Sequence, residues 1–230
     1  MNQKTQDDLW QSGRYERKFV AASGSADALI LAVRTHPACF VRPYPDRWVN
    51  NIYLDTLDYC FYGENLAGIT CRKKIRIRWY GKFGHARTPM LEIKRKQGQL
   101  GIKQHYPLED FSMNDPDYEL GALFARANLP LALAEELKRL RPTVCNRYSR
   151  AYFATTAEPL RLTVDSKIMS SAFPKLPHGH FGEVPDLIEL KYPAELSERA
   201  ARVSGVFPFR LSRNSKYVNA MNVHHRVLPD

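Results

Sequence analysis

Several short segments of this chain alternate charged and apolar residues, and most of the charges are positive. The segments are residues 14–19, 74–79, 91–94 and 188–192. Alternation with a period of two is typical of β-strands, because successive side chains point to opposite faces of a sheet. Each strand is therefore expected to have one apolar face and one mainly cationic face. Several such faces turned toward one another would form a cationic cavity with a few carboxylates, which suits a polyanion.

The composition supports an anionic partner. The 230 residues have an ordinary hydrophobic content of 44% but a net charge of +10. Such an excess favours phosphate compounds, nucleic acid or an acidic membrane surface. The first residues are polar, no apolar run is long enough to span a membrane, and the four cysteines form no C-x-x-C pair. We therefore expect a cytoplasmic protein with reduced thiols.

The organisation predicted from the sequence is a flexible tail at residues 1–13 and a single domain at 14–230. Helices are expected at residues 26–35, 58–65, 118–140 (interrupted at 129–130), 194–203 and 213–224. Strands are expected at residues 14–20, 49–55, 70–80, 89–96, 102–108, 143–154, 161–165 and 186–192. The predicted fold class is α+β: a closed antiparallel β-barrel of about eight strands with helices packed outside.

The pattern alone leaves two arrangements open. The ionic face could be solvated on an open sheet, or it could line the inside of a closed one. Like charges opposed on neighbouring strands destabilise a sheet. The clustering of Lys74, Arg76 and Arg78 beside Lys94, Lys96 and Lys103 therefore indicates a compensating anion. The bulky apolar residues on the other faces need cover, which amphipathic helices can provide.

The residue types on the ionic faces suit phosphate and a divalent metal. Arginine donates two parallel hydrogen bonds to phosphate, and lysine adds a point charge. Mg²⁺ and Mn²⁺ prefer carboxylate oxygen, so Glu16, Glu92, Asp165 and Glu189 are candidate ligands, although each could equally be an ion-pair partner.

Other motifs point to no site. His178 and His180 form an H-x-H pair in a loop, but further zinc ligands are not evident. There is no glycine-rich phosphate loop and no evident pairing of a nucleophile with a base. Side chains must therefore hold the polyanion.

These segments together resemble the VTC domain, the polyphosphate polymerase module of the CYTH-like triphosphate tunnel superfamily. The similar segments occur in the same order over residues 14–221: Arg-Tyr-Glu-Arg-Lys-Phe at 14–19, Ile-Tyr-Leu-Asp-Thr at 52–56, Arg-Lys-Lys-Ile-Arg-Ile-Arg at 72–78, Leu-Glu-Ile-Lys at 91–94, Arg-Tyr-Ser-Arg-Ala-Tyr at 147–152, Leu-Thr-Val-Asp at 162–165, Ile-Glu-Leu-Lys-Tyr at 188–192 and Ser-Lys-Tyr at 215–217.

The resemblance implies a tunnel of about eight strands that binds a nucleoside triphosphate or polyphosphate with Mn²⁺ or Mg²⁺. Together with the charged strand faces, it provides an expected site. The catalytic residues would be Arg76, Arg78, Lys94 and Lys216. Phosphate contacts would come from Arg14, Lys18, Lys74, Lys103, Arg150, Lys191 and Ser215. The metal would be held by Glu189, with Glu16 and Glu92 as further candidates.

One departure bears on the reaction. Hydrolytic members of the superfamily typically begin Glu-x-Glu-x-Lys, whereas here Arg14 replaces the first glutamate. The change removes a metal oxygen and adds a phosphate contact, which favours phosphoryl transfer to phosphate or polyphosphate. The alternatives are an inorganic triphosphatase or nucleoside triphosphatase and a non-catalytic polyphosphate-binding module. No nucleic acid is expected as a partner, because the cations alternate with apolar residues instead of forming an exposed stripe. A membrane-protein partner is possible, since related domains work beside one.

Overall fold

The computed structural model describes residues 14–22, 24–98, 100–113, 119–173 and 184–224. The expected tail at residues 1–13 and the pair His178 and His180 lie outside the described residues. In the described part of the chain, no helix is both long and apolar enough to cross a membrane. All four cysteines are free, as expected.

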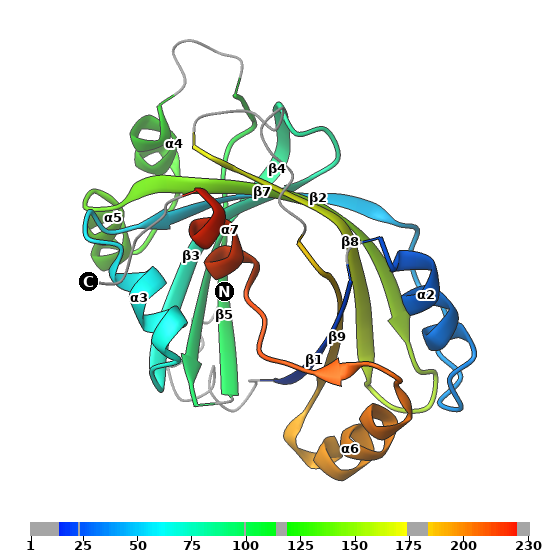
Figure 1. The fold of residues 1–230 in the computed structure, drawn as a ribbon. Coiled ribbons are helices and arrows are strands. Elements are labelled where there is room, and N and C mark those ends of the chain that lie inside the picture. Colours follow the sequence, from blue (N-terminus) through cyan, green and yellow to red (C-terminus); the bar gives the residue numbers. More distant parts are fainter. Residues whose placement is uncertain (1–13, 23, 99, 114–118, 174–183, 225–230) are drawn as a thin grey trace.

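Ten antiparallel strands form one sheet. They are β1 (Tyr15–Ala21), β2 (Arg47–Asp55), β3 (Cys71–Tyr80), β4 (His85–Gln97), β5 (Leu100–Pro107), β6 (Phe111–Ser112), β7 (Arg141–Ala154), β8 (Arg161–Ala172), β9 (Asp186–Tyr192) and β10 (Arg210–Leu211). The order of neighbours is β10-β1-β9-β8-β7-β2-β3-β4-β5, and β6 pairs with β4. Figure 1 shows the sheet arching from β5 through β2 and β7 to β9 and β1.

The expected closed barrel of about eight strands is wrong in its closure and its strand count. Only an isolated bridge joins β1 to β5 among the described residues, with the backbone N of Arg14 donating to the oxygen of Gly101 at 3.3 Å. The free edge of β1 instead pairs with β10 at Phe19 and Val20. Ser212 then donates to the backbone of Lys18. β10 and Ser212 therefore occupy this edge at residues 18–20 and, in the described part of the chain, β5 bridges only to Arg14, the residue before β1. The added strands β6 and β10 have two residues each, too short to show alternation.

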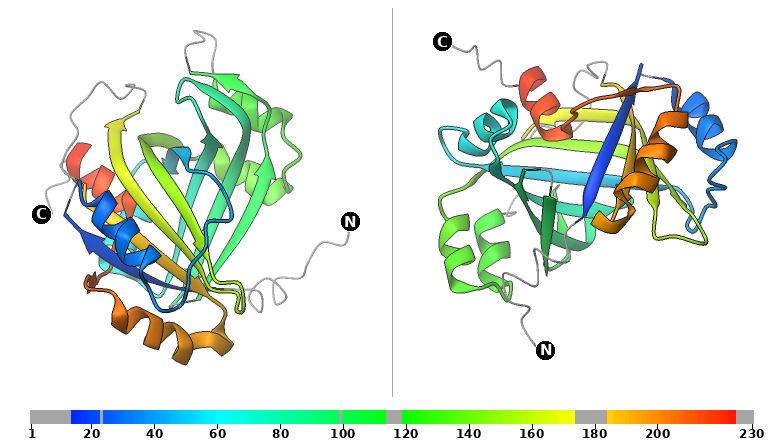
Figure 2. Two further views of the ribbon diagram at one scale, coloured as in Figure 1. Left: turned by 90° about the vertical axis from the view of Figure 1, so that its right-hand side faces the viewer. Right: turned by 90° about the horizontal axis from the view of Figure 1, so that it is seen from below.

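The helices cover the outer face of the arch on two flanks. The helices of the described residues are α2 (Ala26–Arg34), α3 (Cys60–Ala67), α4 (Leu120–Arg126), α5 (Leu131–Leu137), a 3₁₀ turn η1 (Ala194–Leu196), α6 (Ser197–Val206) and α7 (Lys216–His224), of which α7 does not lie on the outer face. Figure 2 shows α4 and α5 on one flank, α2 and α6 on the other, and β1 crossing between them. The break expected at 129–130 is present, because Pro130 precedes α5.

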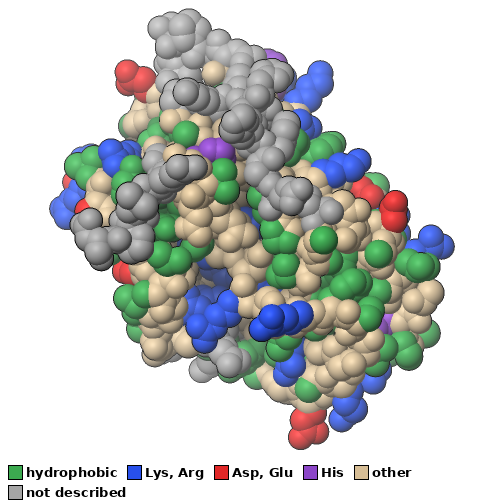
Figure 3. Space-filling model, viewed as in Figure 1, with side chains coloured by type: hydrophobic (Ala, Val, Ile, Leu, Met, Phe, Trp, Pro, Cys, Tyr) green, Lys and Arg blue, Asp and Glu red, His purple; other side chains and the backbone are tan. Residues whose placement is uncertain are grey.

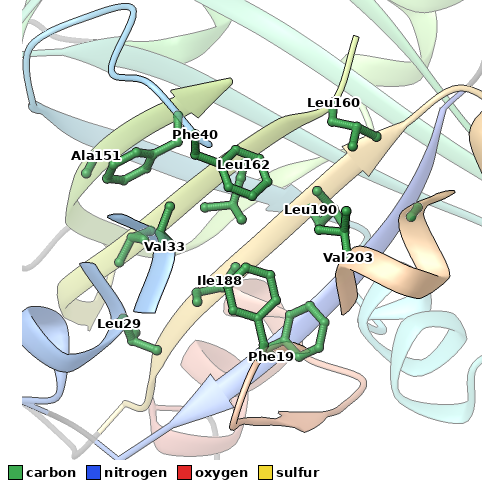
Figure 4. Packing of buried hydrophobic residues seen from close by; sticks show 14 of the residues in the cluster. Phe19, Leu29, Val33, Phe40, Ala151, Leu160, Leu162, Ile188, Leu190 and Val203 are labelled. Atoms are coloured by element: carbon green, nitrogen blue, oxygen red, sulfur yellow. The ribbon is translucent and has the colours of Figure 1, made fainter. Parts of the chain in front are cut away.

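Each flank is held by a hydrophobic cluster whose members follow the periods of strand and helix. Leu29 and Val33 are four residues apart on α2 and fully buried. They belong to the same cluster as Ile188 and Leu190 of β9, which are two residues apart (Figure 4). On the other flank, Leu133 and other side chains of α4 and α5 cluster with apolar residues of β3 and β4. The apolar faces of the strands therefore point outward, under the helices.

The last helix, α7, packs on the inner face of the arch instead. The Tyr217 ring stacks on Tyr53 of β2 with centroids 4.8 Å apart, and its hydroxyl hydrogen-bonds the buried carboxylate of Asp55. The same carboxylate accepts backbone N–H groups of Phe61 and Tyr62 at the start of α3, at 2.9 and 2.8 Å. Asp55 thus ties α3 and α7 to the end of β2, which places the amino end of α7 inside the arch.

Candidate functional site

The charged residues of the strands face the inside of the arch. On β3, Arg76 and Arg78 line an inner cavity. Ile75 and Ile77, which alternate with them, are fully buried in the outer hydrophobic cluster. This follows from the alternation of side chains along a strand.

The inner cavity has a volume of about 610 Å³. The cavity is lined by the site residues expected from the sequence, except the candidate metal ligands Glu92 and Asp165; the lining residues are Arg14, Glu16, Lys18, Lys74, Arg76, Arg78, Lys94, Lys103, Arg150, Glu189, Lys191, Ser215 and Lys216. A second hollow of about 810 Å³ shares Glu16, Lys18, Lys74, Lys94 and Ser215 with it. Figure 3 shows Lys and Arg side chains gathered at a hollow on the face viewed in Figure 1. The alternation therefore predicted the cationic interior correctly, although the strand ladder is open.

Glu92 lies behind the cavity wall and is only 3% exposed. Its carboxylate accepts a hydrogen bond from Arg76 Nε at 2.7 Å and from Arg78 Nη1 at 3.4 Å, and Lys103 Nζ lies 2.5 Å away. Burial alone would raise the pKa of Glu92, but Arg76 and Arg78 hold that pKa well below its usual range. In this structure Glu92 holds the two guanidinium groups in place, a position that differs from the metal-facing one expected for it.

Asp165 orients a second group of cations. It is fully buried and accepts two parallel hydrogen bonds from Arg150, Nε to Oδ1 at 2.5 Å and Nη2 to Oδ2 at 2.6 Å. Lys216 Nζ from α7 lies 2.5 Å from Oδ2. Burial works against ionisation of Asp165, yet Arg150 and Lys216 keep its pKa below the ordinary value. One carboxylate on β8 thus positions a side chain of β7 and one of α7.

Glu16 links the two ends of the arch. Its carboxylate lies 2.9 Å from Lys94 Nζ and 3.0 Å from Lys96 Nζ, both on β4, and 3.7 Å from Lys18. Although burial raises the pKa of Glu16, Lys18 and Lys94 bring it well below the usual value. These ion pairs connect β1 to β4 across the edges where the backbone ladder stays open.

Three lysines of the cationic interior have lowered pKa values. Burial lowers the pKa of Lys74 well below its usual value, and Lys18 and Lys94 lower it further. Burial also lowers the pKa of Lys94 to about 8, despite the opposing effect of Glu16. The pKa of Lys103 falls to about 6 through burial and the nearby arginines, although Glu92 opposes this. The carboxylates present therefore do not neutralise the interior, and an anionic guest would stabilise the charged lysines.

The amino end of α7 adds polar donors to the cavity. Ser215 caps the helix, since its Oγ accepts the backbone N–H of Val218 at 3.3 Å. The same Oγ accepts a hydrogen bond from Lys74 Nζ at 2.8 Å. Free N–H groups and the helix dipole at this end favour an anion.

Glu189 fits the requirements of a metal ligand better than the other buried carboxylates. Among the described residues it contacts Lys18, Lys191, Arg150 and Lys216 at 3.3 to 3.6 Å but accepts no hydrogen bond from them. Burial raises the pKa of Glu189, yet Lys216 and Lys191 hold it well below the usual value, so it is ionised. No cluster of three or more His, Cys, Asp or Glu side chains suited to a metal occurs in the described residues. A metal held by Glu189 would therefore take most of its ligands from phosphate and water.

The cavity is also lined by residues that were not expected from the sequence; these are Tyr15, Tyr53, Gly101, Ile102, His105, Tyr148, Arg161 and Tyr217. Two of them support arginines: the hydroxyls of Tyr53 and Tyr148 accept hydrogen bonds at 3.2 Å from Arg76 and Arg78, respectively. A signal was available for Tyr148, which precedes Arg150 by two residues and so shares its strand face. His105 lies 3.6 Å from Glu92, a contact that depends on the pairing of β4 with β5.

Comparison with solved structures identifies similar folds at low sequence identity. HpAC1 from Hippeastrum, described as a candidate adenylyl cyclase with a dominant triphosphatase activity, has a TM-score of 0.56 and 17% identity over 92% of this chain and 96% of that one. PH1819 from Pyrococcus horikoshii OT3 has a TM-score of 0.52 and 14% identity over 92% and 99%. A candidate adenylate cyclase from Vibrio parahaemolyticus has a TM-score of 0.52 and 12% identity over 91% and 98%. The TM-scores show a shared fold.

The family follows from the sequence. Comparison with the curated proteins finds no match. The sequence model of the VTC domain matches residues 13–225, nearly the whole chain, which confirms the resemblance inferred from the ordered segments. This protein belongs to the VTC domain family.

Proposed function

We propose that this protein is a phosphotransferase that moves the γ-phosphoryl group of a nucleoside triphosphate to a phosphate or polyphosphate acceptor in the inner cavity. The observation that carries the proposal is the surplus of buried cations. Among the described residues that line the cavity, the carboxylates are Glu16 and Glu189, against a majority of Lys and Arg. Only a ligand with several negative charges compensates the positive charge of these side chains, and membership of the VTC domain family supports such a ligand.

The arrangement suits phosphoryl transfer because the cations are held in position before a substrate arrives. Glu92 aligns Arg76 and Arg78, and Asp165 aligns Arg150 and Lys216. The transferred group needs little covalent help, so positioning and charge stabilisation supply most of the acceleration. Preorganised guanidinium groups act on the developing charge without reorganising during the reaction.

A divalent ion, Mn²⁺ or Mg²⁺, would add positive charge to the phosphates when bound. Glu189 and Glu16 are the residues that would hold it. Lys18 lies between them, with Nζ 3.6 Å from Glu189 and 3.7 Å from Glu16, so an ammonium group already occupies the position shared by the two carboxylates. Lys18 would have to turn toward phosphate to release them.

A triphosphatase that uses the same cavity is the second candidate. It is favoured by the shared fold of HpAC1, which is described as having a dominant triphosphatase activity. Arg14 argues against it, because it lines the cavity at the place where hydrolytic relatives have a glutamate. With one carboxylate fewer, activation of water by a metal is weaker, and the guanidinium offers another contact to phosphate.

Product analysis separates these functions. Purified protein is incubated with ATP, Mn²⁺ and a short polyphosphate, and the products are resolved by length. Chains longer than the input support the phosphotransferase, and phosphate release without lengthening supports the triphosphatase. Saturable binding of tripolyphosphate without metal-stimulated turnover would indicate a binding module and refute both enzymatic functions.

A matched pair of variants ties the activity to the cavity. Lys191→Met removes a lining cation, whereas Lys138→Met removes an exposed lysine that pairs with Glu135. We expect turnover to fall in the first variant and not in the second. Equal turnover in the two variants would place the reaction elsewhere.

A further inference from the structure

An arginine surrounded by three tyrosines lies beside the inner cavity. Cζ of Arg47 is 5.5 Å from the ring centre of Tyr44, 5.7 Å from that of Tyr80 and 5.9 Å from that of Tyr152. The rings of Tyr44 and Tyr152 meet edge to face with centroids 5.9 Å apart. We name these four residues the tyrosine–arginine cluster.

Strand register places the cluster on the same inner face as Arg78 and Arg150, which are proposed to bind phosphate. Arg47 of β2 is the direct partner of Arg150 on β7, and opposed residues of an antiparallel pair share a face. Tyr152 is the next residue of that face on β7, two positions beyond Arg150. On β3, Tyr80 likewise follows Arg78 by two positions. The cluster therefore continues the row of Arg78 and Arg150 by one step.

The cluster is exposed and lacks a carboxylate. Tyr44 is 55% exposed and Tyr80 is 44% exposed, so neither ring contributes much to the core. Among the described residues, the side chain of Arg47 makes only ring contacts and no ion pair or hydrogen bond. By contrast, Arg150, the direct partner of Arg47 on β7, donates two hydrogen bonds to Asp165. An unpaired guanidinium among exposed aromatic rings offers flat surfaces for stacking and a positive charge next to the phosphate wall.

We propose that the tyrosine–arginine cluster binds the base of a nucleoside triphosphate whose phosphates occupy the inner cavity. This inference rests on the proposed function and adds to it a separate site for the base of the nucleotide. The base stacks on the ring of Tyr44 and on the guanidinium of Arg47. Because every base has a π-face, such stacking is tolerant of base identity. ATP and GTP therefore bind alike.

The test compares two ligands that each contain a chain of three phosphorus groups, of which only one carries a nucleoside. Binding of the non-hydrolysable ATP analogue AMPPNP and of inorganic tripolyphosphate is measured by calorimetry, at one fixed Mg²⁺ concentration, for the wild type and for Tyr44→Ala. Loss of one base–aromatic stack weakens binding by about tenfold. We expect this loss for AMPPNP and less than a twofold change for tripolyphosphate. Tyr44→Phe keeps the ring and should restore AMPPNP binding.

A control comes from the same loop. Arg42 stacks on Phe153 at 5.5 Å and pairs with Asp46, so Arg42→Ala removes an arginine–aromatic contact outside the cluster and should change neither affinity. Equal weakening of both ligands in Tyr44→Ala, or no weakening of either, would overturn the inference. Either outcome would leave the proposed function standing, because binding of tripolyphosphate by the wild type tests that function separately. Failure of the wild type to bind tripolyphosphate would overturn both.

Discussion

Replacement of Glu92 by glutamine tests whether this buried carboxylate holds the cationic face together when no anion is bound. Glu92 is 3% exposed and contacts Arg76, Arg78 and Lys103 within 3.4 Å. Glutamine keeps the shape but removes the negative charge that the three cations share. Breaking a buried ion pair by removing one partner costs about 3–5 kcal/mol.

This cost translates into a large change in melting temperature. For a chain of this size, 1 kcal/mol corresponds to roughly 2–4 °C, so Glu92→Gln should melt about 6–20 °C below the wild type. Lys103 moderates the effect, because burial and the arginines already bring its pKa to about 6 and it can release its proton. The arginines cannot. We therefore expect the lower half of that range.

The assay is calorimetric unfolding at pH 7 with and without tripolyphosphate. The anion supplies part of the missing negative charge, so it should raise the melting temperature of Glu92→Gln more than that of the wild type. Glu109→Gln is the control, because Glu109 forms an exposed pair with Arg126, and exposed pairs contribute about 0–1 kcal/mol. Equal melting temperatures of Glu92→Gln and the wild type, with equal responses to tripolyphosphate, would show that Glu92 does not compensate the positive charge of the interior.

Three further predictions concern the proposed reaction. Arg78→Ala should lower kcat/KM for the nucleotide by about 30- to 1000-fold, from a loss of about 2–4 kcal/mol in transition-state stabilisation; full activity in steady-state kinetics would refute its role. Glu189→Gln should abolish the dependence of turnover on Mn²⁺, and an unchanged metal titration would exclude Glu189 as a ligand. Tripolyphosphate binding should take up protons at pH 7–8, because the pKa values of Lys94 and Lys103, about 8 and about 6 in the free protein, rise beside an anion. This lysine contribution to affinity is complete below pH 6 and declines as the pH rises. Calorimetry in buffers of different ionisation enthalpy measures the uptake, and Lys103→Arg, which stays charged, should take up less; equal uptake in both proteins would contradict the assignment.

Much of the site was predictable because it depends on local alternation. A residue two positions from an inward-facing cation also faces inward, which placed Arg76, Arg78 and Lys94 correctly without knowledge of the strand order. The role of Glu92 was not predictable in this way. Its partners follow from the pairing of β3 with β4, where Arg76 opposes Glu92, and a sequence does not state which strands pair or in what register.

The tyrosine–arginine cluster was missed for a related reason. Its residues come from the loop before β2 and from β2, β3 and β7, so no segment of the sequence contains more than a part of it. Closure of the sheet could not be predicted from local alternation either, because it depends on which strand pairs with the free edge of β1. β10 pairs with that edge at Phe19 and Val20, and a strand of two residues is too short to show alternation in the sequence.

The two faces of each strand follow from the order of residues along the chain: one face is cationic, and the other is apolar and needs helices to cover it. These properties follow from the geometry of single strands and helices and from the cost of leaving apolar surface in water. Tertiary structure alone decided which carboxylate pairs with which cation, where α7 enters the arch and where the sheet stays open. Those outcomes depend on contacts between residues far apart in the chain, such as Asp55 with Tyr217 and Glu16 with Lys94, which form only after the strands have found their neighbours.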